Sequence, residues 1–219
     1  MTSRPERAAP VVLSLLMLVH AAIYAAVCAI KYHWFLYDDI DLAMFTHLTA
    51  GLLRGSLASS IGGMSGLGDH SSLNLFLIAP IYAVARTPLT LLMLQTIALS
   101  LGAIPVHRMA LRELGDARAA LACAALYLLQ PALGYLNLYE FHPEALSTPA
   151  LLAALAMLRE GRTRSTAVWA GLALLGKEDV ALVVITMSLY ALARRLPESR
   201  RQFGWLFGLS LASLALSFG

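Results

Sequence analysis

Acidic and histidine residues gather in four short stretches of this sequence, each at the edge of an apolar run. The stretches lie at 37–41, 68–70, 139–144 and 176–179. Carboxylate and imidazole groups exchange protons near neutral pH, and they also ligate divalent cations. Lys177, in the last stretch, offers a positive charge to a phosphate group. These residue types indicate acid–base chemistry or the binding of a phosphate-bearing substrate.

The first stretch places three aspartates ahead of a predicted surface helix. Apolar residues follow at the spacing of a helix that lies on a membrane surface: Leu42, Phe45, Leu48 and Leu52. A carboxylate at the start of such a helix can act as a general base at the boundary between water and lipid. Acids there also complement the helix dipole, but three exceed what capping requires. We therefore interpret Asp38, Asp39 and Asp41 as catalytic candidates.

The stretch at 139–144 combines two acids and a histidine around a proline. Pro143 suits the first position of a helix. The titratable residues then cluster near the N-terminal dipole of that helix. A purely structural loop seldom carries two acids and a histidine at the edge of a bilayer. Glu140 and Glu144 are therefore catalytic candidates, and His142 is a candidate for substrate binding.

The other two stretches carry candidate ligands for a phosphate group or a metal ion. Asp69 and His70 can bind either one, and the structural alternative is a loop whose aspartate caps a helix. Lys177, Glu178 and Asp179 are candidates for substrate binding, and an internally paired Lys–Glu turn is the alternative. No cofactor is certain. If a divalent metal ion is bound, we expect its ligands among four residues: Asp69, His70, Glu140 and His142.

The composition requires an environment of lipid around these stretches. The chain has 219 residues, of which 59% are hydrophobic and 13% charged. Soluble domains carry about 25% charged residues, so this chain cannot cover a globular surface with polar groups. Residues 11–30 hold no charge, and twenty helical residues span a hydrocarbon core of about 30 Å. The basic residues sit in short clusters, as orientation signals do, so we do not expect nucleic-acid binding.

Apolar segments and basic clusters together predict a topology. The apolar segments lie near 11–31, 73–85, 88–107, 119–138, 145–158, 166–176, 180–193 and 203–219. The basic clusters between them are Arg4 and Arg7; Arg108, Arg112 and Arg118; Arg159, Arg162 and Arg164; and Arg194, Arg195, Arg200 and Arg201. The positive-inside rule places all four clusters in the cytoplasm, so an even number of crossings must separate them. We therefore expect 73–85 not to span, and two short helices to turn at 177–179 on the outer side.

This topology predicts an all-α, polytopic transmembrane bundle in the cell membrane, with a cytoplasmic N-terminus and about half a dozen crossings. It collects eight of the 13 acids on the non-cytoplasmic side and 12 of the 16 Lys and Arg residues on the other. We expect a single domain over 1–219, with interfacial helices in an outer loop at 32–86. Because the chain ends inside the apolar run 203–219, we expect it to be the N-terminal part of a longer protein.

Four polar residues inside the apolar segments are expected to be structural. Gln95 and Asn137 should form hydrogen bonds between helices, because amide side chains pair across helices in lipid. His20 and His107 should be packed within the bundle or lie near its interface. We expect none of the four to take part in chemistry.

The polar stretches resemble, in order and spacing, a prokaryotic multipass family called domain of unknown function 2079. The resemblance covers 37–195 and rests on Asp41 to Phe45, Leu67-Gly68-Asp69-His70, Ala79-Pro80-Ile81-Tyr82, Tyr139 to Pro143 and Lys177-Glu178-Asp179. The family commonly has glutamine where this chain has His47, and aspartate where it has Glu140. His47 can donate a hydrogen bond in place of the glutamine amide, so it is a further candidate for substrate binding.

That family in turn is similar to membrane glycosyltransferases of the GT-C type, which include protein O-mannosyltransferases and lipid A aminoarabinose transferases. The resemblance implies a GT-C-like bundle that moves a sugar from a polyprenyl-phosphate donor to an acceptor on the non-cytoplasmic side. It matches Asp41, Asp38 or Asp39 to a first acid, Glu140 or Glu144 to a second acid, and Lys177 to the phosphate contact. The lipid bilayer and the lipid-linked sugar donor are the implied partners.

Two other classes of function remain open at the level of sequence. A transporter or permease would line a pathway with its acids, and it predicts ionisable groups at mid-membrane depth. Nearly all ionisable residues here lie at segment ends, which argues against transport. A non-catalytic membrane scaffold would keep the acids for topology, and the ordered clusters argue against that.

Overall fold

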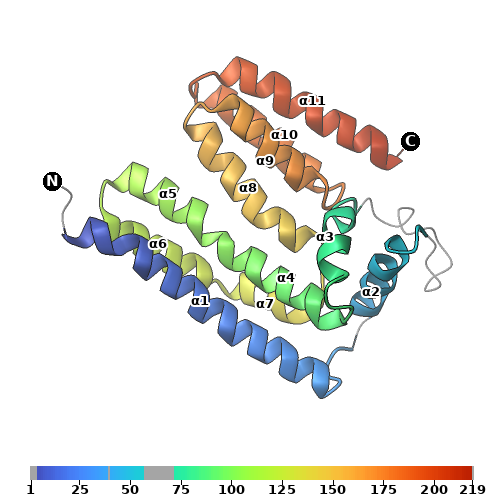
Figure 1. Ribbon diagram of the computed structural model, residues 1–219. Coiled ribbons are helices and arrows are strands. Elements are labelled where there is room, and N and C mark those ends of the chain that lie inside the picture. The colour runs from blue at the N-terminus through green and yellow to red at the C-terminus, as the bar shows by residue number, and fades with distance from the viewer. Residues whose placement is uncertain (1–3, 39, 57–71, 219) are drawn as a thin grey trace.

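The computed structural model describes residues 4–38, 40–56 and 72–218 (Figure 1). Within these ranges the chain forms eleven α-helices and no strand. The helices are α1 (Arg4–His33), α2 (Asp41–Leu52), α3 (Leu75–Tyr82), α4 (Pro88–Leu101), α5 (Ala103–Leu114), α6 (Ala117–Leu128), α7 (Pro131–Tyr139), α8 (Glu144–Arg159), α9 (Thr163–Leu174), α10 (Val180–Ala193) and α11 (Ser199–Phe218). The prediction of an all-α transmembrane bundle is confirmed.

Two apolar stretches of the described chain are long enough to cross a membrane. They are Ala8–His33 and Pro88–Leu114, of 26 and 27 residues, and the second runs through both α4 and α5. A third crossing results if α6 and α7, which meet at a bend of 41°, count as one broken span. Pro131 lies at this bend, and proline lacks the N–H that continues a helix.

This count is lower than the half dozen crossings that the sequence predicts. Helices α8, α9 and α10 have 16, 12 and 14 residues, whereas a transmembrane helix needs about 20. The prediction of two short helices around 177–179 is confirmed by α9 and α10. The prediction that 73–85 does not span is also consistent with α3, which has 8 residues.

The turns of the bundle fall at two opposite ends (Figure 1). The α5–α6, α8–α9 and α10–α11 turns lie at the end where α1 begins, and α2 and α3 lie at the other end. At the first end Arg108 donates two hydrogen bonds of 2.6 Å to Glu160, and Arg159 lies 2.8 Å from Glu113. Asp116 accepts hydrogen bonds from two backbone N–H groups as the N-cap of α6. The arginine clusters that the charge pattern assigns to one side therefore do share one end, which we call the basic end.

At the opposite end, which we call the acidic end, α2 and α3 cover the loops between the long helices. The apolar residues Leu42, Phe45 and Leu48 of α2, which their spacing in the sequence assigns to a membrane surface, are instead buried within the protein, in one core cluster with Phe141. The Phe45 ring meets the Phe141 ring edge to face at 5.7 Å, so α2 packs directly on the α7–α8 connection. This packing fixes the first residue of α2 beside that connection.

Candidate functional site

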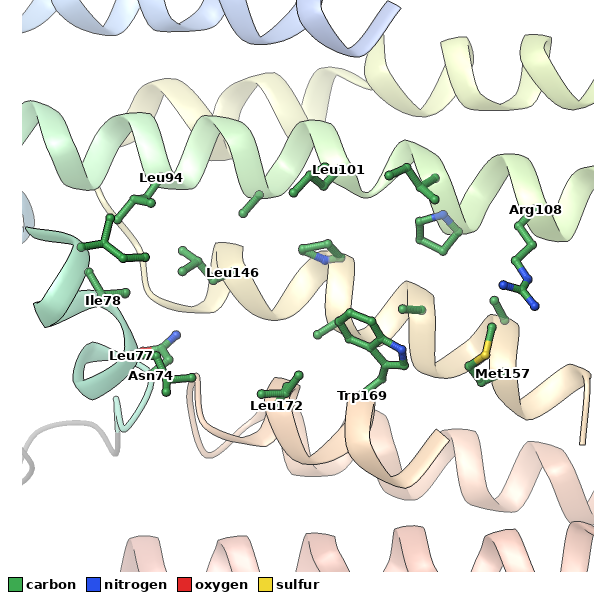
Figure 2. Close-up of a pocket in the computed structure, with 18 residues that line it drawn as sticks. Asn74, Leu77, Ile78, Leu94, Leu101, Arg108, Leu146, Met157, Trp169 and Leu172 are labelled. Carbon is green, nitrogen blue, oxygen red and sulfur yellow. The ribbon is translucent and has the colours of Figure 1, made fainter. Parts of the chain in front are cut away.

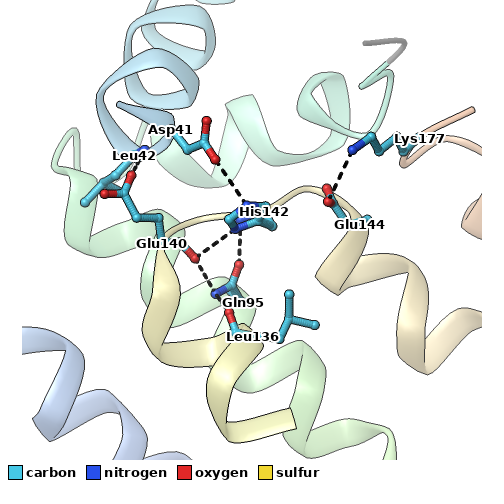
Figure 3. A network of polar contacts seen from close by, with 8 residues as sticks. All are labelled: Asp41, Leu42, Gln95, Leu136, Glu140, His142, Glu144 and Lys177. Atoms are coloured by element: carbon cyan, nitrogen blue, oxygen red, sulfur yellow. Dashed lines mark hydrogen bonds and ion pairs between the residues drawn. The ribbon is translucent and has the colours of Figure 1, made fainter. Parts of the chain in front are cut away.

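The carboxylate of Asp41 faces the imidazole of His142 at the acidic end (Figure 3). Asp41 is the first residue of α2, and His142 lies in the connection between α7 and α8. The distance from Oδ2 of Asp41 to Nε2 of His142 is 3.1 Å, and the two side chains are 29% and 18% exposed. The pair can therefore reach a substrate and still hold each other in place.

Glu140 lies beside this pair, and its carboxylate is held by α2. Its Oε2 accepts a hydrogen bond of 2.6 Å from the backbone N–H of Leu42, and the residue is 1% exposed. The first N–H groups of a helix have no partner within the helix, and Ile40 at the N-cap of α2 offers no side-chain bond. Glu140 supplies that partner through its Oε2. This geometry favours a positioning role for Glu140 over direct contact with substrate.

Gln95 of α4 holds the backbone on both sides of Glu140. Its Nε2 donates to the carbonyl of Glu140 at 2.8 Å and to those of Leu136 and Asn137 at 3.2 and 3.3 Å. Its Oε1 accepts from the backbone N–H of His142 at 2.7 Å. Gln95 is fully buried, and its hydrogen bonds fix the loop that carries His142.

Asn137 completes the contact between α4 and α7. Its Oδ1 accepts a hydrogen bond of 2.9 Å from the Thr96 hydroxyl. The prediction that Gln95 and Asn137 bond between helices is confirmed.

Lys177 and Glu144 form a second charged pair next to His142 (Figure 3). Nζ of Lys177, in the α9–α10 link, lies 3.7 Å from Oε1 of Glu144, the first residue of α8. The side chains are 25% and 29% exposed, and the long distance makes this a loose pair. Lys177 therefore remains available to an anionic ligand.

Ser147 sets how closely the α9–α10 link approaches α8. Its hydroxyl donates to the carbonyl of Ala173 at 2.8 Å. A Cβ on Gly176 would lie only 2.1 Å from Oγ of Ser147, so a side chain here would displace the Ser147 hydroxyl. Lys177 follows Gly176 in the chain, so the contact between Gly176 and Ser147 positions it.

The other predicted site residues differ in how far they are exposed. Asp38 and Asp179 are exposed, and His47 and Glu178 are partly buried. Asp39, Asp69 and His70 lie outside the described residues. Within the ranges that the structure describes, no group of three or more His, Cys, Asp or Glu side chains has a geometry for a metal ion.

No sequence pattern pointed to Asn74, which joins three loops. Its Nδ2 donates to the carbonyl of Pro143 at 2.8 Å, and its backbone N–H donates to the carbonyl of Leu175 at 2.7 Å. It thereby ties the start of α3 to the loops that carry His142 and Lys177. An asparagine in a polar loop is too common in sequences to mark such a role.

Lys31 and Tyr37 connect α1 to the same end of the molecule. Nζ of Lys31 donates to the carbonyl of Leu138 at 2.6 Å and lies 4.5 Å from the centre of the Tyr37 ring. Burial raises the pKa of Tyr37 above its ordinary value, so the phenol stays neutral. The segment that leads into α2 is held by these contacts.

An apolar cavity of about 580 Å³ runs beside the site, between α4–α5 and α8 (Figure 2). Asn74, Leu77 and Ile78 line its acidic end, and Arg108 lies at the other end. Trp169 and Leu172 of α9 and the side chains of α8 complete its walls. Its lining suits a long hydrocarbon chain and, through Asn74, it adjoins the loop of His142.

The helices and the separation of charge between two ends define an α-helical membrane protein. A family model described as "Predicted membrane protein (DUF2079)" matches residues 32–219. The chain belongs to this family. No curated protein and no solved structure matches the chain.

Proposed function

We propose that the protein is a GT-C-like membrane glycosyltransferase, which moves a sugar from a polyprenyl-phosphate donor to an acceptor on the non-cytoplasmic side. The observation that carries the proposal is the pairing of Asp41 with His142 next to Lys177 and Glu144. A proton acceptor and a cation for phosphate thus lie close together beside an apolar cavity. The sequence resemblance to GT-C enzymes points to the same chemistry.

Asp41 acts as the general base in this proposal. The acceptor hydroxyl attacks the anomeric carbon, and a new carbon–oxygen bond forms. The bond from that carbon to the phosphate oxygen breaks, and polyprenyl phosphate leaves with the electron pair. Asp41 takes the proton of the acceptor, which is the role of the base in inverting sugar chemistry. His142 keeps the Asp41 carboxylate oriented through the 3.1 Å contact.

Lys177 is the phosphate contact. A donor phosphate that approaches Lys177 replaces the loose pair with Glu144 by a charge-assisted hydrogen bond. Glu144 then remains beside the site as a second carboxylate. Glu140 supports the reaction indirectly, because it anchors the first turn of α2 and so places Asp41.

The apolar cavity accommodates the lipid tail of the donor. From Leu94 to Arg108 it follows α4–α5 for about 21 Å, at ~1.5 Å per residue. One leaflet of a hydrocarbon core is about 15 Å deep, half of ~30 Å. The cavity is longer than that, which favours a polyprenyl chain over a tail that spans a single leaflet.

Release of label from the donor tests this proposal. Membranes that contain the protein are incubated with polyprenyl-phosphate donors carrying different radiolabelled sugars. Label should leave the lipid fraction with at least one donor, and Asp41→Asn membranes should retain it. If label stays in the lipid fraction with every donor for the unaltered protein, the proposal fails.

One observation favours transport as a second candidate. His20 is 7% exposed and lies near the middle of the Ala8–His33 span, where its Nδ1 is 2.8 Å from Oγ of Ser100. An ionisable group inside a span commonly marks a pathway for ions or protons. Proton flux into proteoliposomes that stops in His20→Gln would support transport. Flux that is absent from the unaltered protein would exclude proton transport by this route.

A further inference from the structure

A polar cavity lies at the basic end, opposite to Asp41 and His142. It has a volume of about 490 Å³ and lies between the α8–α9 and α10–α11 turns. Its walls are formed by Gly161, Arg162, Thr163, Arg164, Ser165, Glu198 and Arg201. The two turns approach closely, because a Cβ on Gly161 would lie 2.8 Å from Cβ of Pro197. Nothing in the proposed transfer reaction uses this cavity.

Positive charge dominates its lining. Arg162, Arg164 and Arg201 face a single acid, Glu198, among the residues of the wall. Arg162 also lies 3.9 Å from Glu160, whereas neither Arg164 nor Arg201 has an ion pair within the described ranges. The cavity therefore attracts an anion that fits between the two turns.

The N-terminus of α9 opens onto the same cavity. Arg162 is its N-cap and offers no side-chain bond, and the N–H of Thr163 is taken by the carbonyl of Gly161 at 3.0 Å. The next two N–H groups, of Arg164 and Ser165, have no acceptor in the described part of the chain. Free N–H groups and the positive end of a helix dipole favour a bound anion.

The side chain of Thr163 gives an independent indication of a ligand. The residue is 7% exposed, and its hydroxyl is buried with no hydrogen-bond partner among the described residues. A buried hydroxyl without a partner is unfavourable, so native structures almost always satisfy it. An oxygen atom of a ligand in the cavity would accept its hydrogen bond.

We propose that this cavity binds a phosphate group. Its tetrahedral oxygens can bond the arginine side chains, the free N–H groups of α9 and the Thr163 hydroxyl together. Selection for orientation in the membrane accounts for arginines at this end, but it requires neither an open helix N-terminus nor a buried, unpaired hydroxyl beside them. The phosphate belongs either to the headgroup of an anionic lipid or to a soluble molecule.

Two probes of the purified full chain distinguish these sources. Inorganic phosphate is titrated into the detergent-solubilised protein at constant ionic strength. Binding is measured as a rise in the midpoint temperature of thermal unfolding. In parallel, nanodiscs that contain both phosphatidylglycerol and phosphatidylcholine are used to measure which lipid the protein retains. Preferential retention of phosphatidylglycerol, with or without binding of inorganic phosphate, identifies a lipid headgroup as the source, and binding of inorganic phosphate alone identifies a soluble molecule.

Substitutions test whether the phosphate group binds in this cavity. Thr163→Val and Arg201→Gln should each weaken binding about tenfold, the loss of one hydrogen bond to a charged group. Thr163→Ser keeps the hydroxyl and should bind like the unaltered protein, as should the matched control Arg200→Gln, whose side chain does not line the cavity. Because the hydroxyl of Thr163 has no partner among the described residues, Thr163→Val should fold normally.

Two results would overturn the proposal. One is that the unaltered protein binds neither inorganic phosphate nor phosphatidylglycerol in preference to phosphatidylcholine. The other is that Arg200→Gln weakens binding as much as Arg201→Gln, since binding would then depend on net charge and not on the cavity.

Discussion

Nε2 of His142 lies 3.1 Å from Oδ2 of Asp41, although the two residues come from segments far apart in the sequence. The contact exists because α2 packs against the α7–α8 connection and Glu140 anchors the first turn of α2. It brings the first and third of the polar stretches together. The role of each residue in transfer can be tested separately.

Replacing His142 tests whether it orients Asp41. His142→Gln should keep more transfer than His142→Asn, because the longer amide can place a donor near the position of Nε2 while the shorter one cannot. We expect a loss of about tenfold for the glutamine variant, within the range for one charge-assisted bond, and a larger loss for asparagine. Initial rates of label release measure both. Equal losses in the two variants would contradict an orienting role.

Replacing Glu140 tests its structural role. Glu140→Ala leaves the N–H of Leu42 buried without this partner and should lower the free energy of unfolding by about 1–3 kcal/mol. Glu140→Gln keeps an acceptor oxygen and should cost less. Thermal unfolding in detergent and protease cleavage near α2 report the difference. If both variants fold as stably as the unaltered protein, Glu140 does not anchor α2.

The effects of substituting Gly176 and Ser147 on the free energy of unfolding should depend on each other. Gly176→Ala should destabilise the protein by about 1–3 kcal/mol, since its Cβ would lie 2.1 Å from Oγ of Ser147. Adding Ser147→Ala removes that oxygen and should restore part of the loss. A double-mutant cycle of unfolding free energies measures the coupling. Additive effects of the two substitutions would show that the contact does not set the position of the link.

The stability of the basic end should depend on pH through Glu160. The hydrogen bonds from Arg108 lower the pKa of Glu160 below its ordinary value of 4.5. Because its pKa is lowered in the folded state, Glu160 stabilises the protein above pH 4.5. This stabilisation is lost as the pH falls through the lowered pKa of the folded state.

Glu160→Gln should therefore be less stable than the unaltered protein near neutral pH, by about 0.2–1 kcal/mol for a pair of which Arg108 is half exposed. The difference should vanish well below pH 4.5. Unfolding free energies at the two pH values provide the test. A difference that persists in acid would point to a cause other than this pair.

Much of the fold could be predicted from the sequence, because lipid imposes simple constraints on composition. The apolar segments became helices, and the arginine clusters came together at one end because few lipid-facing positions tolerate charge. The number of crossings was predicted less well. The charge pattern predicts α9 and α10 as short helices and still counts each as a crossing, although at 12 and 14 residues they are shorter than the ~20 that a span needs.

The residue types of the candidate site could be predicted from the sequence, but the role of each residue within the site could not. The sequence singled out Asp41, Glu140 and His142 but could not show that Glu140 is buried under α2. That depends on tertiary packing, as do the bonds of Gln95 and Asn74 to backbone carbonyls. A single polar residue in a helix or loop carries no pattern from which such partners follow.

The most direct test of the account compares Asp41→Asn with the matched control Asp38→Asn in transfer from a radiolabelled polyprenyl-phosphate sugar. Asp38 is exposed and lies just ahead of α2. Asp41→Asn should lower the rate by about 10²–10⁴, the range for loss of a general base, while Asp38→Asn should retain it. Full transfer by folded Asp41→Asn protein would contradict the assignment of the site.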